Sequence, residues 1–414
     1  MATSIIQPDN QGYYAQYLVQ SSTFPQISNL ERNGTVAPIE AEPGFPVQYT
    51  GERVWSGSEM LTKQHDWIID LSEEDQNRIL EALRHFQSLK VGPETLTTET
   101  FPLPQNLAKR LRLISSDCYN GRGFAILRGI QPEKFTEEEN VLVFAGISSY
   151  VAPKRGFQDI NRESVICHVV SEQLKPGADE KNLRPAFTNG RLTFHTDLGE
   201  ILTLYTLDIS ESAGETMIVS SSYLYNELAK TRPDLLHEFN EKWACFHSQD
   251  YNKDGTPIAT NAPGDKLVFQ YSRLPTTGFG NLKANETLPS PSPKLLEAMS
   301  VLEDLALKHA LPLPRQRGDI VYFNNLCLMH GRKAFDLDTD GRPLLSKRHL
   351  VKLMLQDPEF TWDIPGSMGT IMRRVYGPNR DDGGREEKWQ LSLSADNSLS
   401  GQRRWAGEGS VSNG

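Results

Sequence analysis

One short segment places a histidine and an aspartate two positions apart. His195 and Asp197 lie in Arg191-Leu-Thr-Phe-His-Thr-Asp-Leu-Gly-Glu200. Alternate residues of a β-strand point to the same side, so a strand here would present an imidazole and a carboxylate together. Two histidines and one carboxylate form the facial triad that binds Fe(II) and leaves coordination positions open. The segment therefore offers two of three possible iron ligands, but a surface pair at a loop edge has the same pattern.

Among the nine histidines, His330 is the best candidate for the third ligand. It ends a segment in which the apolar run 320–323 passes through Asn324-Asn325 into a second apolar run. An imidazole buried at the end of such a run needs a polar partner, because burial without one is costly. A metal ion would be such a partner, and so would a hydrogen bond within the core. Asn324 is placed to orient His330, or only to form the turn.

A further apolar segment carries two cations. Arg348 and Lys352 would lie on one face of a strand over residues 348–355. A guanidinium binds a carboxylate through two parallel hydrogen bonds, so an inward Arg348 beside a metal would suit a dicarboxylate. An exposed edge strand with solvated charges would explain the same pattern.

The elements that must position these residues can be predicted from capping signals and periodicity. We expect helices over 72–89, 104–118, from Thr136 to about 150, and over 293–309. A strand is predicted over 124–129, followed by short β-runs at 164–170, 202–207, 267–271, 319–323 and 348–355. Many short strands with irregular spacing favour a sandwich or barrel with helical insertions. Composition predicts a weakly ordered leader over 1–60, one domain over 61–377 and a disordered tail over 378–414.

Charge and cysteine content limit the classes of function. The 414 residues include 43 basic and 53 acidic side chains, for a net charge of −10, which argues against a general nucleic-acid binder. No apolar run approaches the roughly 18 residues of a membrane span, and the start lacks the pattern of a signal peptide. We therefore expect a cytoplasmic protein without membrane contact. The four cysteines are far apart in sequence and predict reduced, buried thiols. The sequence carries no signal for oligomeric state.

Taken in order, these motifs resemble the TauD/TfdA-like family of Fe(II)/2-oxoglutarate-dependent dioxygenases, in particular its fungal clavaminate-synthase-like branch. The ordered set is far more specific than any single motif, and it extends over about residues 70–360. The matching segments are His195-Thr-Asp197, Gly214-Glu-Thr216, Gly318-Asp-Ile-Val-Tyr-Phe-Asn-Asn, His330-Gly-Arg-Lys-Ala-Phe, Arg348-His-Leu-Val-Lys-Leu and, nearer the N-terminus, Asn120-Gly-Arg-Gly-Phe-Ala-Ile-Leu-Arg-Gly129.

The resemblance implies a fold, a set of cofactors and an activity. The fold would be mainly β with helical additions (α+β), around a double-stranded β-helix, the cupin-like jelly roll. His195, Asp197 and His330 would bind Fe(II), while Thr216 and Arg348 would bind the distal carboxylate of the cosubstrate 2-oxoglutarate. Such an enzyme uses O2 to hydroxylate or desaturate a small organic molecule and releases succinate and CO2.

One position departs from the family pattern. In taurine dioxygenase a second arginine, four residues after the cosubstrate arginine, contacts the substrate sulfonate, and here Lys352 stands at that position. Lysine is a point charge and lacks the planar fork of arginine, so we do not expect taurine to be the substrate. Lys352 remains a candidate contact for a carboxylate-bearing or amino-acid-like substrate. His168 and Gln158, which precede the metal motif, are candidates for lining the substrate pocket.

Two other functions are compatible with the same residues. A zinc hydrolase would use the same three ligands, would need a general base beside the metal and would leave Thr216 and Arg348 without a role. A non-catalytic jelly-roll binding protein would keep the fold, and would normally have lost one of the three ligands.

Overall fold

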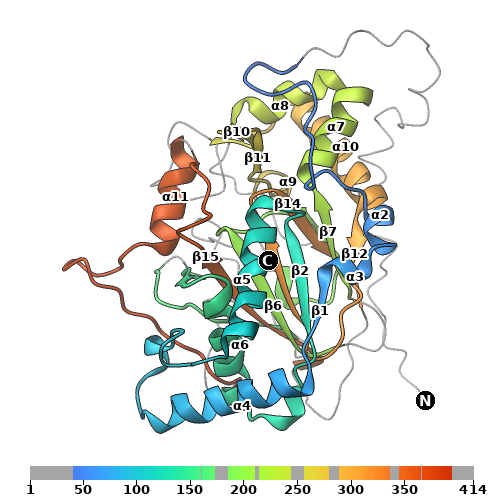
Figure 1. Cartoon of the computed structure of the whole chain (residues 1–414). Coiled ribbons are helices and arrows are strands. Elements are labelled where there is room, and N and C mark those ends of the chain that lie inside the picture. The colour runs from blue at the N-terminus through green and yellow to red at the C-terminus, as the bar shows by residue number, and fades with distance from the viewer. Residues whose placement is uncertain are drawn as a thin grey trace, which may run out of the picture.

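The computed structural model describes residues 41–159, 161–172, 185–209, 214–243, 256–278, 289–335, 345–364 and 366–393. Two β-sheets form its core, and helices surround them (Figure 1). This arrangement confirms the predicted jelly roll with helical additions. Among the described residues, no helix combines the length and the apolar character that crossing a bilayer requires.

The larger sheet has seven strands in the order β1-β2-β13-β6-β15-β3, with β4 also paired to β15. Its pairings are antiparallel except for the parallel pair β1–β2. The strands are β1 (Ile68–Asp70), β2 (Phe124–Arg128), β3 (Lys154–Arg155), β4 (Cys167–Glu172), β6 (Ile201–Asp208), β13 (Ile320–Asn324) and β15 (Leu345–Gln356). Alternation along these strands places one set of side chains inside the barrel.

The smaller sheet has four antiparallel strands in the order β12-β7-β14-β5. They are β5 (Leu192–His195), β7 (Thr216–Ser220), β12 (Leu311–Pro312) and β14 (Leu328–Arg332). Two further strand pairs are β8 (Lys242–Trp243) with β9 (Thr256–Pro257), and β10 (Ala259–Ala262) with β11 (Lys266–Phe269). The turn between β13 and β14 carries the chain from the larger sheet to the smaller one, as predicted from the Asn324-Asn325 pair.

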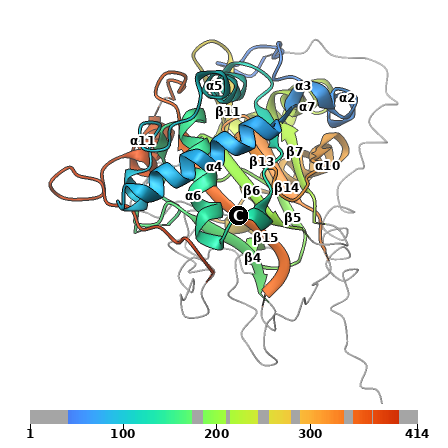
Figure 2. The ribbon, with the colours of Figure 1, turned by 60° about the horizontal axis from the view of Figure 1, so that its bottom comes forward.

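Three long helices lie together against the larger sheet (Figures 1 and 2). They are α4 (Glu73–Ser88), α5 (Gln105–Asn120) and α6 (Glu137–Val151), and capping boxes at Ser72 and Thr136 begin α4 and α6 as predicted. α6 is apolar on nearly all sides because it is enclosed by α4, α5 and the sheet. The Tyr205 hydroxyl on β6 donates to Asn140 Oδ1 on α6 at 2.7 Å, which joins this helix to the sheet.

A second group of helices lies beside the smaller sheet. It contains α7 (Ser221–Thr231), α8 (Leu236–Asn240) and α10 (Pro293–His309), and α10 follows the predicted range with Ser292 as its cap. The short elements are α2 (Gly57–Leu61), α3 (Gln64–Trp67), α9 (Leu274–Thr277), α11 (Gly366–Tyr376), η2 (Pro93–Thr95), η3 (Pro132–Lys134), η5 (Pro185–Phe187) and η6 (Pro233–Leu235). Of the four cysteines, Cys118 and Cys327 are buried free thiols, Cys167 is also buried, and Cys245 lies outside the described residues.

The ends of the folded unit differ from the prediction. Residues 41–60 were assigned to the leader, but Tyr49 and Trp55 in this stretch are buried. The Trp55 indole donates to the Arg122 carbonyl at 2.9 Å, and the Tyr49 amide donates to Asn226 Oδ1 at 2.9 Å. Tyr49 and Trp55 anchor this segment to the domain. The average composition of residues 1–60, which is mostly polar, does not reveal these two contacts. Residues 1–40 lie outside the described range.

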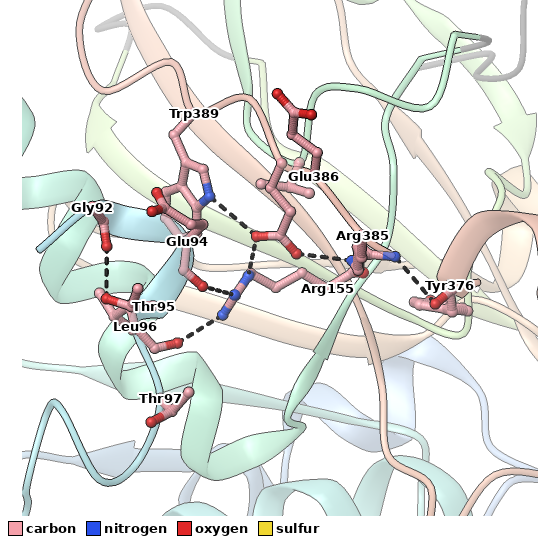
Figure 3. Close-up of polar contacts among 12 residues, drawn as sticks. Gly92, Glu94, Thr95, Leu96, Thr97, Arg155, Tyr376, Arg385, Glu386 and Trp389 are labelled. Atoms are coloured by element: carbon pink, nitrogen blue, oxygen red, sulfur yellow. Dashed lines mark hydrogen bonds and ion pairs between the residues drawn. The ribbon is translucent and has the colours of Figure 1, made fainter. Parts of the chain in front are cut away.

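The beginning of the predicted tail is also part of the fold (Figure 3). Glu387 accepts from Arg155 on β3 and from Arg385, each at 3.0 Å, and the Trp389 indole donates to it at 3.1 Å. The Arg155 guanidinium also lies 5.0 Å from the centre of the Trp389 ring. Residues 378–393 therefore pack on the domain despite their polar composition, and 394–414 lie outside the described range.

Candidate metal centre and active site

His195 and His330 are cross-strand partners. β5 and β14 run antiparallel with His195 directly opposite His330, and the two imidazole ring centres are 4.2 Å apart. Asp197 follows two residues after His195, just beyond the end of β5. One donor atom from each of the three residues lies within 4.8 Å of the others, and all three residues are buried. The structure thus brings together the three residues predicted as metal ligands.

The donor atoms of this cluster have no hydrogen-bond partner in the described part of the chain. They are His195 Nε2, Asp197 Oδ1 and His330 Nδ1. His195 Nδ1 lies 2.8 Å from the Thr193 carbonyl oxygen, so the proton sits on Nδ1 and Nε2 keeps its lone pair. Buried polar atoms without partners are costly, and a cation between them would satisfy all three. Two imidazoles and one carboxylate are the donor set expected for Fe(II).

The pKa values suit metal binding. Burial lowers the pKa of His330 to about 3 and also lowers that of His195. Both imidazoles are therefore neutral at physiological pH, which is the form that binds a metal. Burial alone would raise the pKa of Asp197, but the positive charge of Lys352 and its hydrogen bond to the carboxylate outweigh burial and leave the pKa below its usual value. Asp197 is therefore ionised.

Lys352 on β15 pairs with this aspartate. Its Nζ lies 2.9 Å from Asp197 Oδ2, and both side chains are almost completely buried. The sequence left open whether Lys352 faces outward or contacts substrate. The structure places its ammonium inside the barrel, on the oxygen of Asp197 that does not face the histidines.

Asn325 holds the backbone around Asp197. Its Oδ1 accepts from the Asp197 amide at 2.9 Å, and its Nδ2 donates to the Asp197 carbonyl at 2.7 Å and to the Gly199 carbonyl at 3.0 Å. The sequence left open whether its neighbour Asn324 orients His330 or only forms the turn, and the Asn324 amide donates to the Cys118 carbonyl at 3.1 Å. Asn324 therefore stabilises the turn, while Asn325 positions Asp197, one of the three predicted ligands.

Glu303 on α10 is a second residue that the sequence did not suggest. It is fully buried, forms an ion pair with Arg191, and its Oε2 accepts from the Phe194 amide at 3.1 Å. Burial raises the pKa of Glu303 to about 7, against the opposing effect of Arg191. A signal existed, because Glu303 lies at helical spacing between the inward residues Met299 and Ala306. It fixes β5 immediately before His195.

A group of buried cations surrounds Thr216 on β7. Thr216 pairs with Arg332 across β7 and β14, two residues along from the Ile218–His330 pair. The guanidinium carbons of Arg332 and Arg348 lie 5.0 and 5.4 Å from the ring centre of Phe335. Thr216 and Arg348 are each 4% exposed, so this region is inside the protein and carries positive charge. The structure therefore brings both residues predicted to bind the cosubstrate into buried positions, with Thr216 on the strand that pairs with the His330 strand.

A steric constraint explains why the Gly214-Glu-Thr216 motif begins with glycine. Gly214 has φ +90°, and a Cβ there would come within 2.9 Å of Phe335 Cδ1. Only glycine combines this backbone conformation with this close approach to the ring. The motif thus places Thr216 against the Phe335 cluster.

The two substrate candidates upstream of the metal motif lie elsewhere. His168 pairs with Val351 on β15, so its side chain lies on the opposite face of that sheet from Lys352. Its Nδ1 is 2.8 Å from His349 Nε2, and its Nε2 is 2.9 Å from the Gln390 carbonyl oxygen. Gln158 is buried and its Nε2 donates weakly to the Val165 carbonyl at 3.4 Å. These contacts lend no support to a substrate role for either residue.

Comparison with known proteins agrees with this geometry. A sequence model of the family described as taurine catabolism dioxygenase TauD, TfdA family matches residues 87–354. The chain belongs to this family. The match confirms the resemblance found in the motifs, and it makes the protein an oxygenase that depends on iron and 2-oxoglutarate.

Two relatives and one solved structure illustrate the likeness of this TauD/TfdA-family protein to known proteins. It is 32% identical over 331 residues to the taurine hydroxylase-like protein SAT17 of Stachybotrys chartarum, covering 78% of this chain and 84% of the relative. It is 23% identical over 311 residues to FR-33289 synthase of Streptomyces rubellomurinus, covering 74% and 89%. A structure of asparagine oxygenase in complex with Fe(II), 2S,3S-3-hydroxyasparagine and succinate shares the fold, with a TM-score of 0.52 at 15% identity over 70% of this chain and 94% of that one.

Proposed function

We propose that this TauD/TfdA-family oxygenase hydroxylates or desaturates a small organic molecule while 2-oxoglutarate is converted to succinate and CO2. His195, Asp197 and His330 would hold the iron. The observation that carries this proposal is a set of three buried donor atoms that have no hydrogen-bond partner among the described residues. Two of them come from histidines on paired strands and the third from Asp197, just beyond one of these strands. Fe(II) with 2-oxoglutarate and O2 supplies an oxidant strong enough to remove hydrogen from an unactivated C–H bond.

Thr216 and Arg348 would bind the distal carboxylate of 2-oxoglutarate. Thr216 lies two residues along β7 from the partner of His330, which is roughly 7 Å along a strand. That spacing suits a five-carbon diacid with one end at the metal and the other at Thr216. The guanidinium of Arg348 can bind the carboxylate through two hydrogen bonds, and the hydroxyl of Thr216 can donate a third.

The residues of the protein would bind and orient the iron and the cosubstrate, and none of them would act as an acid or a base. Asn325 and Lys352 fix Asp197, Glu303 fixes the strand of His195, and burial of the ligands keeps water from the metal. Hydrogen-atom removal needs no general base. The family membership and the complete set of three donors favour this function over the zinc hydrolase and the non-catalytic binding protein that the sequence left open.

For the primary substrate we propose an amino-acid-like or carboxylate-bearing small molecule. The structural likeness to asparagine oxygenase, solved with a hydroxylated amino acid, supports this class. Lys352 no longer supports it, because its ammonium already pairs with Asp197. Taurine is disfavoured, since a lysine bonded to a metal ligand does not reproduce the planar arginine contact to a sulfonate.

Succinate formation tests the proposal. Purified protein with Fe(II), O2 and 2-oxoglutarate should release succinate slowly without substrate, and faster when an amino-acid-like substrate is found by screening. Arg348→Met should lose this turnover while retaining iron, whereas His330→Ala should lose both. Unchanged turnover in Arg348→Met would remove Arg348 from the cosubstrate site, and metal-dependent hydrolysis without succinate would favour the zinc enzyme.

A further inference from the structure

We propose that Arg315 is a second guanidinium contact for the distal carboxylate of the 2-oxo acid, acting beside Arg348 and Thr216. Arg315 follows β12 in the loop before β13, and none of the motifs that identified the family includes it. The inference rests on the proposed function, because it concerns the same cosubstrate. It predicts a carboxylate site with two arginines, which would select strongly for a diacid over a monoacid.

Two nitrogen donors of the Arg315 guanidinium remain available for a ligand. Its Nε and Nη1 are buried and have no hydrogen-bond partner in the described part of the chain. Guanidinium nitrogens are obligatory donors, and leaving them buried without an acceptor is costly. Such an arrangement is expected where the acceptor is a ligand.

The backbone places Arg315 next to Thr216. The Leu313 amide donates to the Thr216 carbonyl at 2.9 Å, and the Arg315 amide donates to the Leu313 carbonyl at 2.8 Å. The positive charges of Arg315 and Arg332 add to burial in lowering the pKa of Arg348 well below its usual value. The guanidinium groups of Arg315, Arg332 and Arg348 therefore lie near the start of β7, where Thr216 is located.

None of the described charged groups around Arg315 accepts a hydrogen bond from its Nε or Nη1. Arg332 donates through its terminal nitrogens to the carbonyls of Pro185, Ala186, Thr188 and Gly190, so it holds the preceding loop in place. Asp319 attracts Arg315 electrostatically, but both of its oxygens bind Arg128, at 2.9 and 2.8 Å. Glu215, the other attracting carboxylate, is 42% exposed and lies 3.8 Å from Lys333. Its Oε2 has no hydrogen-bond partner among the described residues, so this oxygen is not bonded to Arg315. Arg315 therefore retains donors for an added carboxylate.

Arg315, Arg332 and Arg348 lie near two carboxylates, of which Asp319 is bonded to Arg128 and Glu215 is partly exposed, so the region has a local excess of positive charge. Burial lowers the pKa of Arg315 to about 10, which still leaves the side chain charged at physiological pH. A bound carboxylate would balance this charge and satisfy the unpartnered nitrogens together. Charge-assisted hydrogen bonds of this kind are the strong ones in proteins.

The test compares binding of a diacid and a monoacid to the full-length, iron-loaded protein without oxygen. Dissociation constants for 2-oxoglutarate and for 2-oxopentanoate, which lacks the distal carboxylate, are measured from the visible band of the iron–2-oxo acid chelate. Arg315→Met should weaken 2-oxoglutarate about 10- to 100-fold, the range for charged hydrogen bonds, and should leave 2-oxopentanoate and the iron affinity unchanged. Arg315→Lys should recover part of the loss.

The matched control is Arg317→Met, which removes an exposed guanidinium two residues along the same loop. It should leave all three constants unchanged. If Arg348→Met weakens 2-oxoglutarate and Arg315→Met does not, the role of Arg315 is overturned and the proposed function stands. If wild-type protein gives no band, the proposed function itself fails, and if Arg348→Met has no effect, the proposed cosubstrate site at Arg348 fails. Equal weakening of both acids by Arg315→Met would mean that Arg315 supports the fold alone, and would overturn the inference.

Discussion

The ammonium nitrogen of Lys352 lies 2.9 Å from Oδ2 of Asp197, within the barrel. This contact leaves Asp197 Oδ1 facing the two histidines, where it has no hydrogen-bond partner among the described residues. Asp197 can therefore contact two cations, the ammonium of Lys352 on β15 through Oδ2 and, as we propose, a metal ion through Oδ1. The lysine thus becomes part of the support for the metal site.

Lys352→Met should destabilise the metal-free protein more than the metal-loaded protein. Without the lysine, Asp197 remains a buried charge, at a cost of about 3–5 kcal/mol for breaking a buried ion pair. A bound metal would compensate that charge. Urea unfolding under nitrogen, with and without Fe(II), measures the loss in free energy of unfolding for the metal-loaded and the metal-free protein. Lys388→Met is the control, because Lys388 forms a solvent-exposed pair with Glu163 at 2.8 Å. An equal loss with and without iron would contradict the role given to Lys352.

Asn325→Ala should weaken iron binding by about 10- to 100-fold, as expected for loss of a residue that orients a ligand. The substitution leaves the Asp197 amide and the carbonyls of Asp197 and Gly199 without their partner. Competition with a chelator of known affinity measures the change. Asn140→Ala removes an equally buried asparagine that bonds to Tyr205, far along the sheet, and should cost stability without weakening iron binding. Similar affinities for the two variants would contradict the positioning role.

The metal-free protein should lose stability as the pH falls below about 6.5. The pKa of His330 is lowered to about 3 in the folded protein from an ordinary 6.5. Between these values the unfolded chain binds a proton that the folded chain does not, so folding weakens by about 1.4 kcal/mol per pH unit for each such histidine. His330→Gln should make this pH dependence shallower in urea unfolding between pH 7 and 4. His85→Gln, at an exposed position on α4, should leave the slope unchanged.

Glu387→Gln should destabilise the protein by about 1–3 kcal/mol while leaving the iron affinity unchanged. The Glu387 side chain is almost completely buried and binds Arg155, Arg385 and the Trp389 indole, so its neutral replacement leaves the two arginines without their charge partner. Glu386→Gln is the neighbouring control, because Glu386 is 67% exposed and its ion pair with Arg380 is 3.8 Å long. Thermal unfolding distinguishes the two. Equal melting temperatures would show that residues 378–393 contribute little to stability.

The parts of the fold that sequence predicted well have strong local signals. The capping boxes at Ser72 and Thr136 fixed the starts of two helices, and the apolar runs on either side of Asn324-Asn325 marked β13 and β14. The metal cluster was also predictable, because His195 and Asp197 share a short motif and His330 ends an apolar run. The tertiary structure then places them together, as expected from the ordered motifs.

The remaining features depend on strand register and on contacts between distant segments. Which of two adjacent asparagines reaches Asp197 is decided by the turn geometry, and which face of β4 carries His168 is decided by its pairing with β15. The partner of Lys352 lies 155 residues away in sequence. Likewise, Tyr49 and Trp389 attach their segments to the domain through contacts of individual side chains, which the average composition does not reveal.

The most direct test of the central claim is anaerobic titration of the metal-free protein with Fe(II) and then with 2-oxoglutarate, followed by visible absorption. The arrangement of His195, Asp197, His330 and Arg348 predicts a charge-transfer band that appears only after both additions. The band should be lost in His195→Ala and His330→Ala, and should need much more 2-oxoglutarate in Arg348→Met. Folded protein that binds iron at these residues and gives no band with 2-oxoglutarate would contradict the account.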